Sequence, residues 1–194
     1  MSKKGFTLIE LLIVIALLGA LAVGLLAAID PLEQFRKGSD TSVRSIASEL
    51  HQGIIRSYAS LSRMPWDTDN SAQYINAFAD TNVVRTNVIQ QVINVGELKS
   101  NFAEVAGEGK LSRIWVAGQD GGDDTNPLNP QVIVCYRPES RSQRCDPNTV
   151  FTVDTTAIGI SSVSRDTTTC NSTNCGNTNY NCYWCIGDVP VSTP

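Results

Sequence analysis

Apolar residues are concentrated at the amino-terminal end of the chain, in a single long run. Residues 6–29 make up 24 positions, and Glu10 is the only charged residue among them. The 19 residues from 11 to 29 carry no polar side chain. At about 1.5 Å per residue, a helix over 6–29 reaches roughly 36 Å, which exceeds the hydrocarbon core of a bilayer at about 30 Å. The pattern therefore predicts a membrane-spanning helix.

After residue 29 the pattern becomes that of an amphipathic helix. Asp30 and Pro31 suit the N-cap and the first position of a helix. Apolar residues then recur at spacings of three and four, namely Val43, Ile46, Ala47, Leu50, Ile54, Tyr58 and Leu61. We expect the segment Gly38-Ser39-Asp40 to loosen this helix locally. Residues 30–62 are expected to continue the first helix, so that a helix from Phe6 to about Ser62 would be roughly 85 Å long.

Shorter patterns after residue 62 indicate a globular head over 63–194. Residues 82–94 favour a short helix, with a strand as the alternative. Three ranges rich in β-branched or aromatic residues predict strands: 111–117, 131–137 and 149–153. Turn-rich segments separate them, so we expect an antiparallel sheet packed against the helix. The predicted fold class is α+β: a long N-terminal helix, apolar and then amphipathic, on a small antiparallel sheet with a Cys-rich loop region at 161–194.

Cysteines are confined to the last third of the chain. There are six of them: Cys135, Cys145, Cys170, Cys175, Cys182 and Cys185. The tail around them has too little apolar content to be held by burial alone, so it needs covalent cross-links. If this part is exported, disulfides are the expected form. A four-thiolate zinc site is the alternative, because one pair has CxxC spacing. Our interpretation joins Cys135 to Cys145 and leaves two bridges in the tail.

Charge and motif content argue against several functions. The formal net charge is −4 and there is no Lys/Arg cluster, so the sequence gives no electrostatic indication of nucleic-acid binding. Lys3 and Lys4 precede the apolar run, which fits an end that stays in the cytoplasm. The sequence has no Ser–His–Asp set, phosphate-binding glycine loop or paired-carboxylate site. We therefore expect neither an enzyme nor a cofactor.

One loop deserves comparison with calcium sites. Asp120, Asp123 and Asp124 place several carboxylates on a single glycine-containing segment, and calcium prefers such oxygen ligands. Their spacing fits no EF-hand. A solvated turn is the favoured interpretation, with calcium binding as the weaker alternative.

Glu10 is the residue that a plain membrane anchor does not explain. A carboxylate in mid-membrane costs about 2.5–3.5 kcal/mol, and less near the interface. The apolar run contains no Lys, Arg or His to compensate it. Cleavage before Phe6 would create an α-amino group about one helical turn away, or within reach of Glu10 in a neighbouring subunit. A secretory signal peptide would have a shorter apolar core of about 7–15 residues, and a buried core helix is a further alternative that fits this position poorly.

The ordered stretch Lys-Lys-Gly-Phe-Thr-Leu-Ile-Glu-Leu-Leu at residues 3–12 resembles the type IV prepilin signature. The resemblance extends over about residues 1–30. It implies that a prepilin peptidase removes a leader of residues 1–5 by cutting between Gly5 and Phe6, and N-methylates Phe6. It also implies that Glu10 sets the register of assembly by meeting the terminal amine of an adjacent subunit.

The resemblance further implies partners and a location. The precursor would lie in the inner, cytoplasmic membrane and would be taken up by the inner-membrane pilus assembly machinery. Copies of the chain would then form a helical filament on the cell surface. By the same resemblance, Gly19 and Gly24 would allow local melting of the helix, with close packing against neighbouring helices as the alternative. Pro31 stands four residues after the position, here Ala27, where many pilins carry Pro, so any kink is shifted.

Three functions remain open from the sequence. The first is a structural subunit of a type IV pilus-like filament. The second is a pseudopilin of a type II secretion system, which the N-terminal segment does not distinguish from the first. The third, of another class, is a membrane-anchored extracellular binding domain that does not polymerise.

Overall fold

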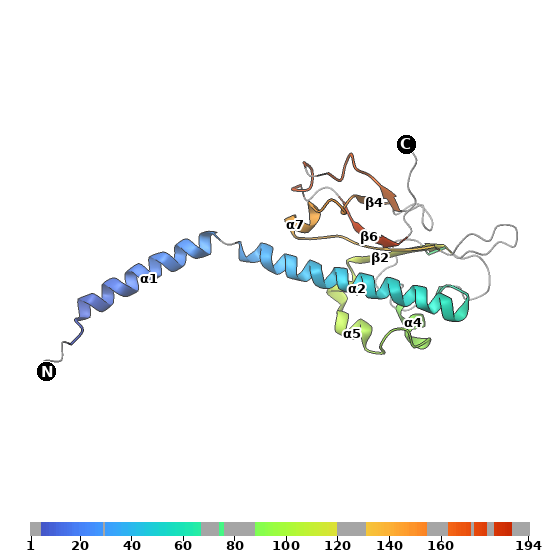
Figure 1. Ribbon diagram of the computed structural model, residues 1–194, viewed down its shortest axis with the longest axis horizontal. Coiled ribbons are helices and arrows are strands. Elements are labelled where there is room, and N and C mark those ends of the chain that lie inside the picture. Colours follow the sequence, from blue (N-terminus) through green and yellow to red (C-terminus); the bar gives the residue numbers. More distant parts are fainter. Residues whose placement is uncertain are drawn as a thin grey trace.

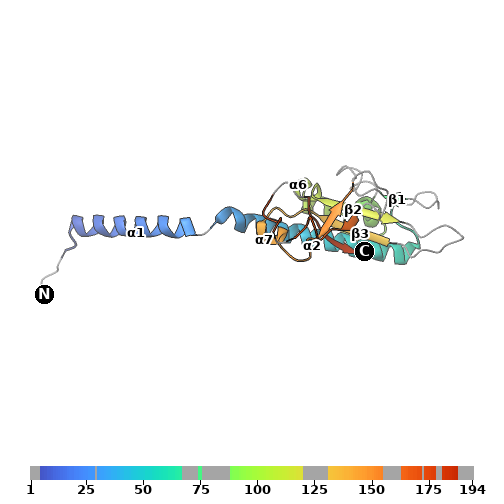
Figure 2. The same ribbon diagram turned by 90° about the horizontal axis from the view of Figure 1, so that it is seen from above.

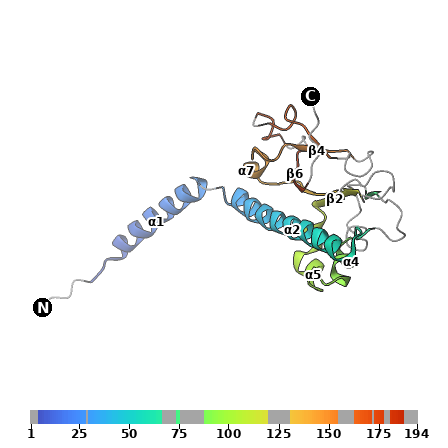
Figure 3. The same ribbon diagram turned by 45° about the vertical axis from the view of Figure 1, so that its right-hand side comes forward.

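The protein consists of an apolar helix that extends away from a head built around a second helix (Figure 1). The computed structural model describes residues 5–28, 30–66, 74–75, 88–119, 131–154, 163–171, 173–177 and 181–187. The first helix, α1, stays clear of the head in all three views (Figures 1, 2 and 3). The head therefore folds on α2 alone.

Two helices stand where one continuous helix was expected. Helix α1 spans Leu8–Ala28 and α2 spans Pro31–Leu61. Asp30 between them has extended backbone angles, φ −82° and ψ 95°, and its side chain caps α2 by accepting the N–H groups of Leu32 and Glu33 at 3.1 and 3.2 Å. The predicted restart at Asp30 and Pro31 is confirmed. The single 85 Å helix is wrong, because a cap residue ends one helix as it starts the next.

Helix α2 contributes one stripe of its surface to the main core. Val43, Ala47, Leu50 and Ile54 are fully buried, with 0% of each residue exposed. Ile46 and Tyr58 are partly buried against the same core, whereas Leu61 at the helix end is exposed. The three- and four-residue spacing thus predicted the buried face correctly, and burial of this face against the head stabilises α2.

The main sheet is antiparallel and has four strands in the order β1-β2-β3-β6. Their bounds are Tyr74–Ile75, Ile114–Gln119, Gln131–Tyr136 and Trp184–Gly187. The C-terminal strand β6 adds to β3, so the end of the chain closes the sheet beside its middle strand. An antiparallel sheet on the amphipathic helix is what the sequence predicted.

Both faces of this sheet are covered, which explains its nearly continuous apolar strands. Val116, Val132, Val134 and Tyr136 point to the core shared with α2. Alternate residues of the same strands, Ala117, Ile133 and Cys135, pack in a second cluster with Val163 and Tyr183. A smaller sheet of β4 (Phe151–Val153) and β5 (Val163–Arg165) lies over that second face. The head is therefore layered, with α2 on one side of the main sheet and β4 and β5 on the other (Figure 1).

Short helices complete the head. They are α4 (Gln90–Asn94), α5 (Phe102–Ala106), α6 (Glu108–Leu111) and α7 (Arg141–Arg144). The short helix predicted near residues 82–94 is confirmed for its described part, while 82–87 lie outside the described residues. The strand predicted from 111 begins only at Ile114, because Leu111 is the buried end of α6.

Three disulfides join all six cysteines. The pairs are Cys135–Cys185, Cys145–Cys175 and Cys170–Cys182. The predicted disulfides are confirmed, but the pairing of Cys135 with Cys145 is wrong. Cys135 instead lies directly opposite Cys185 in the register of β3 and β6, with Cα atoms 4.1 Å apart. The four-thiolate zinc alternative is also wrong, since a disulfide sulfur is not a thiolate.

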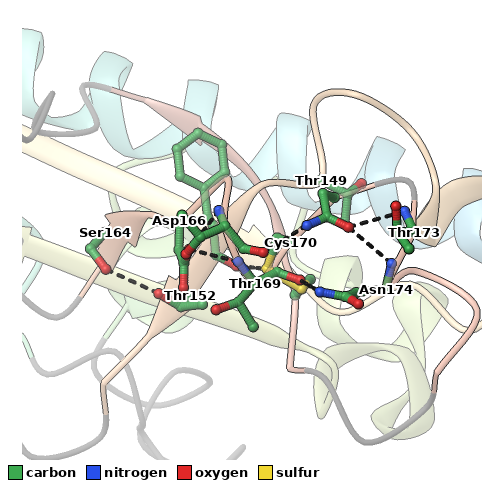
Figure 4. The surroundings of a disulfide bond; sticks show 12 residues. Thr149, Thr152, Ser164, Asp166, Thr169, Cys170, Thr173 and Asn174 are labelled. Carbon is green, nitrogen blue, oxygen red and sulfur yellow. Dashed lines mark hydrogen bonds between the residues drawn. A yellow bond between two sulfur atoms is a disulfide. The ribbon is translucent and has the colours of Figure 1, made fainter.

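The tail bridge is supported by polar turns (Figure 4). The Asp166 carboxylate accepts the Thr168 and Thr169 N–H groups, both at 2.9 Å, in the turn that leads to Cys170. The Thr168 hydroxyl also donates to Asp166 at 2.6 Å, and this hydrogen bond, followed by those from Thr169 and the backbone, lowers the pKa of Asp166 to about 2. The Thr/Asn-rich composition thus becomes local turn structure around a covalent link.

Candidate functional site

The amino-terminal segment enters α1 through three non-helical residues. Gly5, Phe6 and Thr7 precede the helix, which starts at Leu8. All three are exposed, and 78% of Phe6 is open to solvent. A β-carbon added at Gly5 would meet no atom within 4 Å. The peptide bond between Gly5 and Phe6 is therefore accessible and free of helical constraint.

Thr7 and Glu10 form a reciprocal cap at the start of α1. The Thr7 N–H and hydroxyl donate to Glu10 Oε2 at 2.9 and 2.7 Å, and the Glu10 N–H donates to Thr7 Oγ1 at 3.3 Å. This is the capping box of the pattern Thr-x-x-Glu. Thr7 is not among the site residues predicted from the sequence, although its three-residue spacing from Glu10 is the signal of a capping box. The Glu10 carboxylate thus has local partners even before any amine is available.

Helix α1 exposes apolar surface along its whole length. Residues Leu8–Leu26 form a helix that is long and apolar enough to cross a membrane, with a mean hydropathy of 2.8 and none of it buried in the head. Large side chains such as Leu17, Leu21 and Leu26 are 64–69% exposed. Such a surface is stable in lipid or against other helices, and it fits a membrane-anchored precursor.

Gly19 and Gly24 lie within α1 without interrupting it. A β-carbon at either position would meet nothing within 4 Å, so nothing in a single chain requires glycine there. Pro31 is the first residue of α2, where a missing N–H is harmless. The expected roles of Gly19 and Gly24 in helix packing or melting stay predictions.

A second polar cluster, which the sequence did not reveal, fixes α2 to the head. Asp40 is fully buried, and its carboxylate accepts the Glu139 N–H at 3.0 Å and both the N–H and hydroxyl of Ser140 at 2.7 Å. The Arg113 guanidinium also pairs with Asp40. We name these four residues the Asp40 clasp. The expected loosening near Asp40 is wrong, because α2 continues through it and its side chain is held from three sides.

The clasp extends through Arg113 to neighbouring groups. Arg113 donates to Ser39 Oγ at 3.2 Å and to the Arg137 carbonyl at 3.0 Å, and its Nη1 lies 3.5 Å from Glu139 Oε2. Burial, together with the nearby Asp40 carboxylate, raises the pKa of Tyr136 to about 12. These hydrogen bonds compensate for burial of the Asp40 charge and connect α2 to Arg113 and to the segment at Glu139 and Ser140.

The predicted calcium alternative can be compared with the structure only in part. Asp120, Asp123 and Asp124 lie outside the described residues, so the calcium alternative stays a prediction. Among the residues that the structure describes, no three His, Cys, Asp or Glu side chains gather as metal ligands would.

The fold and the amino-terminal segment together combine two features. An exposed apolar helix with one capped carboxylate leads into a disulfide-linked α+β head.

Comparison with known proteins gives a motif at the amino terminus and one similar protein. The prokaryotic N-terminal methylation motif matches residues 1–26. A fimbrial protein of Neisseria meningitidis serogroup A / serotype 4A (strain DSM 15465 / Z2491) is 24% identical over 159 residues, covering 81% of this chain and 86% of that protein. No solved structure matches the chain. The motif and the fimbrial relative support a type IV pilin-like family, which is a structural family and not typically enzymatic.

Proposed function

We propose that the chain is a structural subunit of a type IV pilus-like filament. A prepilin peptidase cuts it after Gly5 and methylates Phe6, and the inner-membrane assembly machinery then adds it to a filament on the cell surface. The main observation in support of this proposal is that α1 exposes apolar residues on every side and contains one carboxylate, Glu10, near its start.

The exposed surface of α1 supports assembly through this helix. At roughly 25 cal/mol per Å² of apolar area, exposure in water would be strongly unfavourable, so α1 must be covered by lipid or by protein. Copies of the same helix, packed side by side, provide the second kind of cover. A filament in which α1 helices form the centre and the heads face outward would cover the apolar surface of α1 and leave the polar heads in water.

Glu10 supports a defined register in that assembly. In an apolar helix bundle its charge is costly unless a cation comes within reach. The N-terminal amine of an adjacent subunit supplies that cation once residues 1–5 are removed. Because Thr7 already holds the carboxylate, the incoming amine would meet a side chain whose position is fixed.

The non-helical residues 5–7 support cleavage at the proposed bond. A peptidase needs an accessible, non-helical strand of backbone, and α1 begins only two residues after Phe6. Glycine at position 5 lets the backbone approach an enzyme closely because it has no β-carbon.

Mass spectrometry of the mature N-terminus tests processing. We expect the first peptide to begin at a methylated Phe6. A chain that keeps Met1, or one cut near Ala28, would contradict the proposal and favour a non-polymerising anchored domain or a secreted product.

Two substitutions at Glu10 separate its charge from its role as a cap. Gln at this position keeps an acceptor for the Thr7 N–H, because the capping box accepts Glu or Gln, whereas Ala does not. If the charge sets the register, Glu10→Gln and Glu10→Ala both give processed subunits and few filaments. Normal filaments from Glu10→Gln would show that the cap, and not the charge, matters. Glu49→Gln on the exposed face of α2 is the control for loss of one charge.

A further inference from the structure

Four arginines converge on one hollow at the end of the head nearest α1. The hollow has a volume of about 560 Å³, and charged or aromatic side chains form most of its lining: Arg36, Arg113, Arg137, Arg144, Glu139 and Trp115. These arginines come from α2, from the segment before β2, from the end of β3 and from α7. Helix α7 lies at the end of the head that faces α1 (Figures 1 and 3).

The hollow is positively charged although the chain is acidic. Four arginines set against Glu139 and the Asp40 carboxylate that Arg113 contacts give 4 − 2 = +2, whereas the whole chain carries −4. Among the residues that the structure describes, the buried Nε atoms of Arg113 and Arg144 have no hydrogen-bond acceptor, so neither guanidinium group has all its donors satisfied by these residues.

The charge and the donors suit a phosphate group. Arginine guanidinium groups bind the oxygens of phosphate through paired hydrogen bonds. A net charge near +2 matches a phosphate better than a single carboxylate. Several elements share the lining of the hollow, as in a site for a lipid headgroup.

The position along the chain indicates the source of that phosphate. The candidate membrane span ends at Leu26, and Arg36 follows 36 − 26 = 10 residues later. Since α1 ends at Ala28 and α2 begins at Pro31, the helical steps rise about 1.5 Å each and the three steps between the helices at most about 3.5 Å each, so Arg36 lies at most roughly 21 Å further along the chain. Helical side chains lean toward the N-terminus of their helix, so Arg36 reaches back toward the membrane.

Exposed apolar side chains lie beside the arginines. Leu32 and Phe35, in the first turns of α2, are 65% and 77% exposed, and the basic residues Arg36 and Lys37 follow directly. Aromatic and aliphatic side chains next to basic ones are typical of segments that lie at a lipid interface.

We infer that this arginine hollow binds the phosphate of an anionic phospholipid while α1 spans the membrane. The head is thereby held against the bilayer before the subunit leaves the membrane. This inference rests on the proposed function only in taking α1 as a membrane span, and it concerns the unprocessed chain.

Native mass spectrometry of the full-length chain in detergent tests the inference. The probes are phosphatidylglycerol and, as the zwitterionic reference, phosphatidylcholine. We expect phosphatidylglycerol to bind more tightly. A basic residue near an anionic lipid surface contributes roughly 1 kcal/mol, which is about fivefold in affinity. Arg36→Gln should therefore weaken binding about fivefold, and Arg36→Gln with Arg144→Gln should weaken it further by a similar factor.

The control is Arg56→Gln, which removes the same charge 20 residues further along α2 (56 − 36), where Arg56 pairs with Glu97 at 2.9 Å. It should leave lipid affinity unchanged. Circular dichroism and the presence of three disulfides check that each variant is folded. Arg36 is exposed, so its single variant remains informative if the double variant fails to fold.

Other outcomes would overturn the inference. Equal affinity for the two lipids, or no loss in Arg36→Gln, removes the site. If inorganic phosphate binds and is weakened by Arg36→Gln, but does not compete with phosphatidylglycerol, the arginines serve another source of phosphate. Failure of the lipid site would leave processing after Gly5 and the Glu10 result unaffected, so the two proposals fail separately.

Discussion

The two long helices bury their surfaces in opposite ways, and each contains a carboxylate that shows the difference. Helix α1 exposes every described side chain, whereas α2 buries seven residues in the head. Glu10 in α1 is exposed and is bound by Thr7, three positions away. Asp40 in α2 is fully buried and is bound by Arg113, Glu139 and Ser140, 73–100 positions away. The polar contacts of α1 are thus local and its apolar surface is left uncovered by the head. The contacts of α2, in contrast, depend on the folded head.

The largest expected effect comes from removing the buried carboxylate. Asp40→Ala leaves Arg113 charged and without its main partner, and breaking a buried pair costs about 3–5 kcal/mol. All three tryptophans lie outside α1, so their fluorescence reports unfolding of the head alone. In denaturant unfolding of the full chain in detergent, the midpoint should fall strongly for Asp40→Ala and stay unchanged for Glu10→Ala. A shift of equal size in both variants would show that α1 and the head unfold together.

A slightly smaller loss of folding stability is expected when one of the disulfides, which are all in the head, is removed. Replacing Cys135 and Cys185 by Ala opens a loop with a sequence separation of 50, against 12 for Cys170 and Cys182. A disulfide restricts the unfolded chain more when its loop is longer. We therefore expect the free energy of unfolding to fall by about 4 kcal/mol without the first pair and by about 3 kcal/mol without the second. The same unfolding assay compares the two double variants. A larger loss for the Cys170 pair would indicate that the tail carries more stability than its loop length implies.

Local features were accessible from the sequence, and long-range ones were not. The apolar run, the cap at Asp30 and the stripe from Val43 to Ile54 follow from spacing within a few residues, and the structure confirms them. The pairing of Cys135 depends on which strand lies beside β3, and β6 comes from 50 residues later. The Asp40 clasp is hidden for the same reason, since a polar residue in a helix gives no sign of partners 100 residues away.

The glycines of the two regions are expected to respond differently to an added β-carbon. Gly187 has a φ of +123°, and a β-carbon there would lie 2.0 Å from the Val132 carbonyl oxygen, whereas at Gly19 it meets nothing within 4 Å. Gly187→Ala should destabilise the head by roughly 1–3 kcal/mol through backbone strain and overpacking. Gly19→Ala should leave head unfolding unchanged and favour α1 by about 1 kcal/mol of helix propensity. If Gly19→Ala forms fewer filaments despite a normal head, the glycine serves contacts between subunits.

The smallest effect concerns Asp166, which lies in the head but is satisfied locally, as Glu10 is. Its pKa is lowered to about 2 by hydrogen bonds from Thr168 and Thr169, so its folded pKa lies below its unfolded value of 3.8. The stabilisation is therefore complete above about pH 4 and disappears as the pH falls through about 2. Because Asp166 is only partly buried and solvent screens its charge, we expect Asp166→Asn to cost less than about 1 kcal/mol at neutral pH.

Unfolding curves of wild type and Asp166→Asn should converge as the pH approaches 2, and Glu104→Gln serves as the control for loss of one exposed charge. A difference that persists at low pH would mean that the turn before Cys170 depends on the shape of the carboxyl group rather than on its charge. Convergence would show that a polar group inside the head can be as independent of distant partners as one in α1. A residue in the head would then not depend on distant parts of the chain merely because of its location. How far along the sequence its partners lie would predict that dependence better.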